Sequence, residues 1–218
     1  MTVGVPAFET TDTPEKNASR AVILLRHAAT TGGEGRAIGR TPLPLSPEGL
    51  RQAAALCKVM RQCRPAALYA SPASRARDTL GPLLDECTVH LIDDMDEIDM
   101  GQWDGRTFDS IRQQEPEQYN RRGRDMAHFK IPGGETFADV QRRVMTAVRH
   151  MAQGPRPAVC ITHAGCLRVA ACTLTRTRLE DLMSFRFSHL HGLAMTGPSS
   201  ALHLEKADVT LEDLPSLL

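Results

Sequence analysis

Residues 21–28 read AVILLRHA, an apolar run that ends abruptly in Arg26 and His27. A short continuous run rich in Val, Ile and Leu is typical of a central strand that is buried on both faces. The two cationic side chains therefore follow the carboxyl end of this strand. Because ligands of open α/β sheets bind at that edge, Arg26 and His27 are placed to meet an anion.

Two further apolar runs end in polar residues of the same kind. Residues 158–162, AVCIT, lead into His163, so the chain presents a histidine at each of two strand ends. Residues 66–71 lead into SPASRARDT, where a helix is predicted to begin with Arg75 in its first turn. A lone histidine is more often a surface or core residue than a catalytic one. An arginine beside a strand end and a helix start, however, is a candidate phosphate ligand.

Strands and helices alternate along the rest of the chain. Apolar residues repeat at helical spacing after Ser46, a capping residue followed by proline, and after Thr136, which with Asp139 resembles a capping box. The remaining β-prone runs are residues 89–92, 192–196 and 201–204. This alternation predicts an α/β fold with a mainly parallel central sheet and helices on both faces.

The length of 218 residues is sufficient for one sizeable core. We predict a single domain over residues 20–218, preceded by a polar, flexible tail at residues 1–19. Residues 104–135 are polar and basic and are predicted to form a small insertion over the sheet edge.

The composition restricts the partners. The 26 basic and 26 acidic residues cancel, so no overall field favours nucleic acid or an anionic membrane. No apolar run approaches the roughly 20 residues needed to cross a bilayer. The six cysteines show no CxxC spacing and are predicted to be reduced, mostly buried thiols. These features predict a cytoplasmic protein, and an edge strand near the C-terminus could pair two chains as a homodimer.

Five stretches carry a resemblance to a known family: LLRHAAT, YASPASRARDT, DEIDMGQWDG, PGGETFADV and ITHAG. In this order they resemble the histidine phosphatase superfamily, which includes the phosphoglycerate mutases. The resemblance covers about residues 22–171. It implies the three-layer phosphoglycerate mutase-like fold and an enzyme that uses no metal or other cofactor. It also implies that the insertion at residues 104–135 is a lid that selects a small phosphorylated metabolite.

The resemblance also implies roles for the charged residues. His27 would attack a phosphate monoester and become a phosphohistidine, with its other ring nitrogen held by a backbone carbonyl. Arg26, Arg75 and a protonated His163 would offset the phosphate charge. Glu97, four residues before Gly101, has the position of the family's proton donor.

The chain departs from the family pattern around the phosphate. Ala28 and Ala164 stand where the family usually has glycine. We therefore expect ordinary negative φ angles at both residues. The family's loop asparagine has no clear counterpart, and the hydroxyl of Thr30 or Thr31 is a candidate replacement. We predict that Thr30 and Ala164 also bind the phosphate.

Two arginines are candidates for contacts with the rest of the substrate. Arg36 fits the family's Arg-x-x-Gly pattern, and Arg106 belongs to the basic insertion. The stretch from Gly35 to Leu45 together with PGGET is similar to the shorter phosphatases around α-ribazole phosphatase. The short insertion favours hydrolysis over a mutase reaction, in which water must be kept out.

Other hypotheses remain open at this stage. A mutase, or a phosphate-binding interaction protein without turnover, would share most of these residues. Two histidines and nearby carboxylates could bind a divalent metal, although Arg26 and Arg75 would repel it. Cys160 and Cys166 flank His163 in sequence and could be nucleophiles, but neither lies in a phosphate-cradling loop.

Overall fold

The computed structural model describes residues 21–218, so the predicted tail at residues 1–19 lies outside the described residues. The strands are β1 Val22–Arg26, β2 Ala67–Ala70, β3 Val89–Leu91, β4 Ala158–Thr162, β5 Gly192–Thr196 and β6 His203–Val209. The α-helices are α1 Pro47–Cys63, α2 Ser74–Thr79, α3 Phe108–Gln114, α4 Pro116–Arg124, α5 Phe137–Gln153, α6 Ala164–Thr175 and α7 Leu214–Leu217. The 3-10 segments are η1 Gly81–Leu83, η2 Asp93–Met95, η3 Gly101–Trp103 and η4 Leu179–Ser184.

The strands form one sheet in the order β3-β2-β4-β1-β5-β6. Strands β3, β2, β4 and β1 run parallel, while β5 and β6 extend the sheet in antiparallel pairs. The mainly parallel sheet is therefore confirmed. The last strand begins at His203 rather than at residue 201 and continues to Val209. Its pattern is mostly exposed, as an edge strand allows, so apolar content alone could not locate it.

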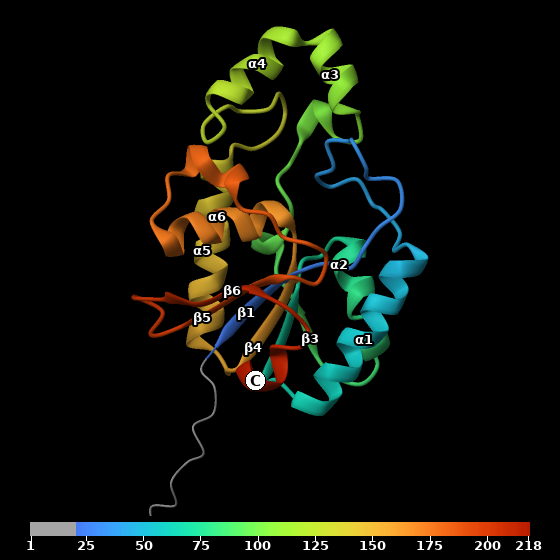
Figure 1. Cartoon of the computed structure of the whole chain (residues 1–218), viewed down its shortest axis with the longest axis vertical. Helices are drawn as coiled ribbons and strands as arrows, with labels where there is room; N and C mark the ends of the chain where they lie inside the picture. Colours follow the sequence, from blue (N-terminus) through green and yellow to red (C-terminus); the bar gives the residue numbers. More distant parts are fainter. Residues whose placement is uncertain (1–20) are drawn as a thin grey trace, which may run out of the picture.

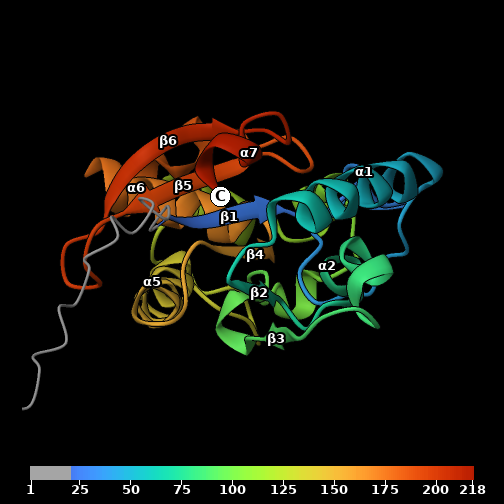
Figure 2. The ribbon, with the colours of Figure 1, turned by 90° about the horizontal axis from the view of Figure 1, so that it is seen from below.

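Helices cover both faces of the sheet (Figures 1 and 2). In β1 the side chains of Val22 and Leu24 pack into the core below α5 and α6, and those of Ile23 and Leu25 pack into the core below α1 and α2. Successive strand residues point to opposite faces, so a strand with a core on each side must be apolar throughout. The unbroken apolar run of β1 thus explains the three-layer arrangement.

Helices α3 and α4 project beyond the sheet edge, at the top of Figure 1. We call residues 104–135 the lid segment; its predicted role in substrate choice stays a prediction. Trp103 lies fully buried at its base, where it stacks on Phe129 with ring centroids 5.8 Å apart and donates to Glu115 Oε2 at 2.9 Å. Within residues 21–218, no helix has the length and apolar character to span a membrane.

Candidate active site

The two histidines meet because their strands are neighbours. Strands β1 and β4 pair in parallel with Arg26 opposite Thr162, so the next residues, His27 and His163, leave the sheet side by side. Their ring centroids lie 5.2 Å apart. The backbone N–H of His27 also donates to the carbonyl oxygen of Thr162 at 2.8 Å, which continues the strand pairing into the site.

His27 is held as a neutral ring with one free nitrogen. Its Nδ1 lies 2.8 Å from the carbonyl oxygen of Ala28, an acceptor only, so Nδ1 carries the proton and Nε2 keeps its lone pair. Burial, together with the nearby positive charge of Arg75, lowers the pKa of His27 well below its ordinary value of 6.5. The predicted contact with a backbone carbonyl is confirmed, and Nε2 is available as a nucleophile.

The backbone after His27 is fixed by two helices. The N–H of Ala28 donates to Thr79 Oγ1 of α2 at 3.0 Å, and the N–H of Ala29 donates to Gln52 Oε1 of α1 at 2.9 Å. Neither Ala28 nor Ala164 is among the described residues with positive φ, as the alanines predicted. The backbone at Ala28 and Ala164 therefore needs no glycine.

Arg75 comes from the first turn of α2 and is fully buried below the site. Its Nη2 donates to the carbonyl oxygen of Gly39 at 2.8 Å and its Nη1 to that of Thr41 at 3.2 Å. Asp104 holds the same loop by accepting N–H bonds from Gly39 and Thr41 at 2.8 and 2.9 Å. The guanidinium is thus locked by the glycine-rich loop before any substrate enters.

His163 is neutral in this structure, which corrects the expectation of a protonated ring. Arg75 Nε donates to His163 Nδ1 at 3.2 Å, so this nitrogen has no proton, and Nε2 lies 2.8 Å from Ser71 Oγ. Complete burial lowers the pKa of His163, against the opposing effect of Asp96, whose Oδ1 is 3.4 Å from Nε2. The sequence could not show that the neighbouring arginine already supplies the positive charge.

Glu97 lies at the opposite wall with its carboxylate fixed by two backbone groups. Oε1 accepts the N–H of Ile98 at 2.9 Å, and Oε2 accepts the N–H of Gly165 at 3.1 Å. Gly165 lies in the first turn of α6, so the N-terminal end of that helix orients the carboxylate. A β-carbon at position 165 would come within 2.1 Å of Glu97 Oε1.

This contact gives a prediction for Gly165→Ala. Alanine favours helices over glycine, and Gly165 has no positive φ, so the variant should fold normally. The added methyl group displaces the Glu97 carboxylate, and we expect kcat to fall at least about tenfold because a misplaced acid loses part of a general-acid contribution of about 10²–10⁴-fold. Gly123→Ala in α4, where a β-carbon meets nothing within 4 Å, is the matched control. Unchanged kcat in Gly165→Ala would show that Glu97 does not act from this position.

An ion pair below the site supports the loop that carries Glu97. Arg143 of α5 pairs with Glu135 through Nε and Nη2, both at 2.9 Å. The same guanidinium donates to the carbonyl oxygens of Asp96 at 2.7 Å and Glu97 at 3.1 Å. Arg143 was not among the residues singled out by sequence, because a helical arginine without a motif is ordinarily solvated.

Arg143→Met should destabilise the protein. The change leaves the carboxylate of Glu135, 21% exposed, without its arginine partner. It also frees the loop carbonyls of Asp94, Asp96 and Glu97, so we expect the free energy of unfolding to fall by about 2–4 kcal/mol. Chemical denaturation measures the change. Arg142→Met, which removes a pair with an arginine side chain 74% exposed, should alter stability by less than about 0.5 kcal/mol. Equal effects of the two variants would contradict the supporting role.

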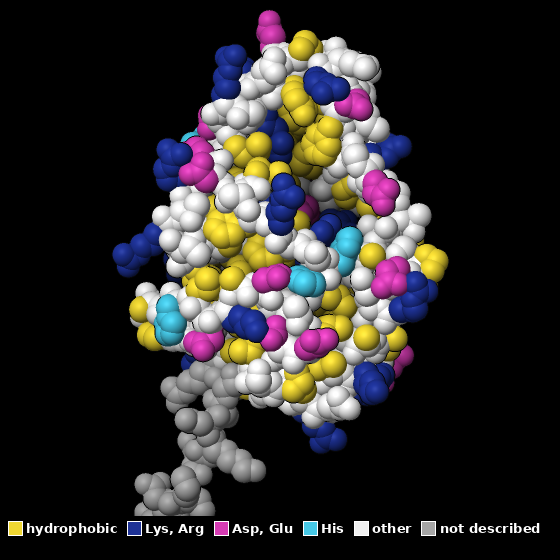
Figure 3. Space-filling view, viewed as in Figure 1, with side chains coloured by type: hydrophobic (Ala, Val, Ile, Leu, Met, Phe, Trp, Pro, Cys, Tyr) yellow, Lys and Arg dark blue, Asp and Glu magenta, His cyan; other side chains and the backbone are white. Residues whose placement is uncertain are grey.

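The site surrounds a cavity of about 220 Å³. Its wall is formed by Arg26, His27, Thr30, Gly33, Glu34, Ile38, Leu43, Arg75, Glu97, Ala164 and His189. Figure 3 shows the hollow beneath the lid segment, with arginine or lysine, carboxylate and histidine side chains gathered in and around it. The structure thus brings together the predicted histidines, Glu97, Arg26, Arg75, Thr30 and Ala164, with His163 lying directly behind Arg75.

Arg36 and Arg106, predicted as substrate contacts, do not line this cavity. Arg36 is exposed and donates through Nη1 to the carbonyl oxygen of Gly105 at 2.8 Å. Arg106 forms an ion pair with Glu115 and donates to Gln114 Oε1 at 3.0 Å. Both guanidinium groups are engaged by partners near the lid segment, which the sequence pattern did not reveal.

Two titratable residues of the cavity wall, Glu34 and His189, were missed by sequence reasoning. The ring of His189 lies 5.5 Å from that of His27, and burial together with the charge of Arg26 lowers its pKa to about 4. Glu34 comes from the glycine-rich loop. His189 follows no apolar strand and belongs to no quoted motif, so no sequence signal separated it from an ordinary loop histidine.

The buried histidines predict how stability depends on pH. The folded-state pKa values of His27 and His163 lie below the ordinary 6.5, so below pH 6.5 the unfolded chain binds more protons than the folded one. The free energy of unfolding should therefore fall as the pH drops from 6.5 to 5, by up to about 1.4 kcal/mol per pH unit for each histidine. Denaturation series should show a smaller slope in His27→Gln. A slope that is equal in both proteins would contradict a lowered pKa at His27.

Burial excludes Cys160 and Cys166 as nucleophiles. Cys160 and Cys166 are fully buried, and burial raises the pKa of both thiols, that of Cys166 to about 12. A thiol rather than a thiolate is a poor nucleophile. Within the described part of the chain, no group of three or more His, Cys, Asp or Glu side chains is arranged to hold a metal ion.

Comparison with known proteins places the chain in a family. The model of the histidine phosphatase superfamily, branch 1, matches residues 22–198. A metal-independent phosphoserine phosphatase of Arabidopsis thaliana is 32% identical over 164 residues, which cover 71% of this chain and 68% of that protein. Phosphoserine phosphatase 1 of Hydrogenobacter thermophilus is 28% identical, covering 75% of this chain and 80% of the relative. A longer bifunctional protein of Mycobacterium tuberculosis is 36% identical over 127 residues, 56% of this chain and 35% of its own length.

Solved structures share the fold. The α-ribazole phosphatase of Shigella flexneri superposes with a TM-score of 0.77 at 23% identity, covering 87% of this chain and 96% of that one. A mycobacterial glucosyl-3-phosphoglycerate phosphatase with inorganic phosphate gives a TM-score of 0.75 at 22% identity, covering 89% and 99%. The fold, the family match over residues 22–198 and the arrangement of the site all indicate the same family. The chain belongs to the histidine phosphatase superfamily.

Proposed function

We propose that this phosphoric monoester hydrolase cleaves a small phosphate monoester without a metal, through a phosphohistidine at His27. One observation carries the proposal: His27 Nε2 keeps its lone pair because Nδ1 is held by Ala28, and the ring lines a cavity with two arginines and Glu97. A phosphate monoester dianion fits such a cavity, since Arg26 and Arg75 offset the charge that would repel a nucleophile.

The proposed reaction has two steps. His27 Nε2 attacks phosphorus, the bond to the leaving oxygen breaks, and Glu97 in its protonated form gives its proton to that oxygen. Glu97 then takes a proton from water, the hydroxide attacks phosphorus, and the P–N bond breaks to release inorganic phosphate and neutral His27. Arg75, fixed by Gly39 and Thr41, pays little reorganisation cost when the charge develops.

The phosphatases named among the relatives and neighbours act on different alcohols. The resemblance of the Gly35 to Leu45 stretch favours α-ribazole phosphate as one candidate, while the relative in Arabidopsis thaliana is named for phosphoserine. The lid segment, α3 and α4, is the part of the chain that we expect to choose among such substrates. A cytoplasmic location and a homodimer stay predictions.

Phosphate release tests the proposal. Purified protein with a chelator, between pH 5 and 8, is offered α-ribazole phosphate, phosphoserine, 3-phosphoglycerate and 4-nitrophenyl phosphate. We expect release that does not need metal and that is absent in His27→Ala. Loss of activity on chelation would contradict the proposal. Conversion of 3-phosphoglycerate to its 2-phospho isomer would show a mutase, and phosphate binding without release from any substrate would show a binding protein.

A further inference from the structure

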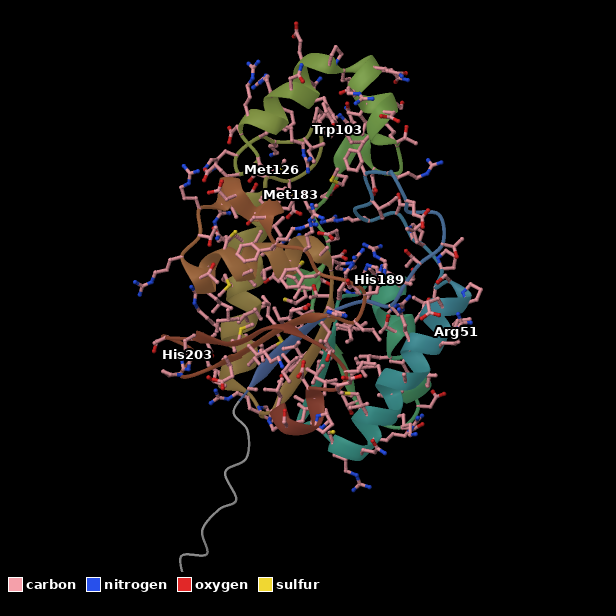
Figure 4. The ribbon with its side chains drawn as sticks, viewed as in Figure 1. Arg51, Trp103, Met126, Met183, His189 and His203 are labelled. Carbon is pink, nitrogen blue, oxygen red and sulfur yellow. The ribbon has the colours of Figure 1, made fainter. Side chains whose placement is uncertain are left out.

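A second cavity, of about 490 Å³, opens beside the phosphate pocket. Arg26 and His189 belong to the walls of both, so the two spaces adjoin. The second cavity is also lined by Arg168 of α6, Arg186 and Met183 of η4. Figure 4 shows Met183 beneath the lid segment and above His189, so this groove lies under the lid. We call it the arginine groove.

Within the described chain, the arginines of the groove form no direct ion pair, although the Glu97 carboxylate acts on Arg26 and Arg168 through its charge. Within residues 21–218, no carboxylate oxygen lies within 4 Å of the guanidinium nitrogens of Arg26, Arg168 or Arg186. Arg26 Nε is buried and has no hydrogen-bond partner in the described chain. Arg168 uses only Nε, which donates to the carbonyl oxygen of Phe185 at 3.1 Å.

The arginines are also close enough to repel one another. Burial is the main cause that lowers the pKa of Arg26 and of Arg168. The charge of Glu97 raises both pKa values, while that of Arg168 lowers the pKa of Arg26 and that of Arg186 lowers the pKa of Arg168. Arg122 of the lid segment is similarly affected by Arg168 after burial. The guanidinium groups of Arg26, Arg168 and Arg186 all line the groove and keep free donors, so an anion bound there would be stabilised.

The position of this charge relates it to the leaving group. Arg26 lies in both cavities, so a ligand whose phosphate contacts Arg26 can extend directly into the groove. Glu97, the proposed proton donor to the leaving oxygen, raises the pKa of Arg168 through its charge, which places the two groups within electrostatic reach. An alcohol that extends from the phosphate past Arg26 therefore enters the groove that Arg168 and Arg186 line.

We propose that the arginine groove binds a second anionic group, carried on the alcohol side of the substrate a few bonds from the phosphate. The substrate class is then a phosphate monoester whose alcohol bears a carboxylate or another phosphate. The inference rests on the proposed function and restricts its substrates to esters of this class. It disfavours α-ribazole phosphate, because the alcohol of that ester is a neutral nucleoside.

Matched substrates test the inference. 3-Phosphoglycerate and glycerol 3-phosphate differ only in a carboxylate that replaces a hydroxymethyl group, and glycerol 1,3-bisphosphate presents a second phosphate instead. We expect kcat/KM to be at least about tenfold higher for one of the two anionic esters than for glycerol 3-phosphate, as one charge-assisted bidentate contact allows. The ranking of the two anionic esters distinguishes carboxylate from phosphate. Equal kcat/KM for all three would overturn the inference.

Substitutions in the arginine groove test whether it causes the preference for an anionic ester. Arg186 is exposed and makes no hydrogen bond or ion pair in the described chain, so Arg186→Gln should fold normally. We expect it to reduce the preference for the anionic ester about tenfold, and Arg186→Lys to restore part of it. Arg149→Gln, which removes an exposed charge from α5, is the control and should leave the preference unchanged. A preference that survives in Arg186→Gln and in Arg168→Gln would overturn the assignment.

A binding measurement separates this inference from the proposed mechanism. Calorimetric titration of His27→Ala protein with the same three esters reports affinity without turnover. Tighter binding of an anionic ester supports the groove even if no ester is hydrolysed by the wild-type protein, which would count against the proposed function alone. Equal affinities, with phosphate release that still requires His27, would overturn the groove and leave the proposed function standing.

Discussion

Replacing His27 with alanine should abolish phosphate release, with kcat/KM lowered by at least about 10⁴-fold, because removal of a catalytic nucleophile costs up to about 10⁶-fold in comparable enzymes. No other described residue can take over its role. The ring of His163 is 5.2 Å away, but it is buried and both of its nitrogens contact Arg75 or Ser71. The ring of His189 is 5.5 Å away, but no backbone carbonyl holds it as Ala28 holds His27. Single-turnover release of inorganic phosphate measures the effect.

The control for this variant is a histidine outside the site. His150, exposed in the last turn of α5, is changed to alanine, and activity should be unaffected. Thermal unfolding of His27→Ala at pH 7.5 checks that the fold is retained. Residual activity within a factor of about 10 of the wild type would exclude His27 as the nucleophile, since loss of an entire covalent pathway costs far more than loss of one binding contact.

Replacing Glu97 with glutamine should produce a loss that depends on the leaving group. For an alkyl phosphate, whose alkoxide needs a proton to leave, we expect kcat to fall by about 10²–10⁴-fold, the usual contribution of general acid catalysis. For 4-nitrophenyl phosphate, whose phenolate leaves without help, the effect on the first step should be much smaller. Comparison of the burst phase for the two substrates measures the difference.

The comparison separates proton donation from positioning. In wild-type protein each oxygen of Glu97 accepts one backbone N–H, from Ile98 or from Gly165. Glutamine has only one side-chain oxygen, and its NH2 group would face the second N–H, so Glu97→Gln also disturbs local structure. A positional defect would slow the first step equally for both leaving groups. Equal losses would therefore show that Glu97 orients the site without donating a proton.

The parts of the site that sequence could predict are those fixed by short-range pattern. The apolar runs that become β1 and β4 each end in a histidine, and parallel strands in one sheet must present their carboxyl ends together. The first turn after β2 places Arg75 at the same edge. Buried strands and their ends are determined locally, so this edge could be located without knowledge of tertiary contacts.

The parts that sequence could not predict depend on which partner a side chain finds. Arg36 and Arg106 look like substrate ligands by motif and by charge, but Gly105 and Glu115 engage them in the folded chain. Arg143 looks like a surface residue but supports the loop of Glu97 from behind. Long arginine side chains have many reachable partners, and only the packing of the lid segment and α5 selects among them.

The charge state of His163 could not be predicted from the sequence either. A histidine at a strand end beside a phosphate pocket suggests a cation, but Arg75 donates to its Nδ1 and burial favours the neutral ring. Likewise, His189 enters the site from the segment before β5, far from any motif. Sequence pattern thus locates the residues proposed as nucleophile and phosphate ligands, while their charge states and the contacts of the lid segment depend on three-dimensional packing.

The most direct test of the account is to map the phosphoryl group on the enzyme during turnover. The reaction with 4-nitrophenyl phosphate, in the presence of a chelator, is quenched in alkali within milliseconds, and the peptides are analysed by mass spectrometry. We expect a phosphoryl group on Nε2 of His27, because Nδ1 is bound to the carbonyl oxygen of Ala28. A phosphoryl group on any other residue, or steady turnover with His27 never modified, would contradict it.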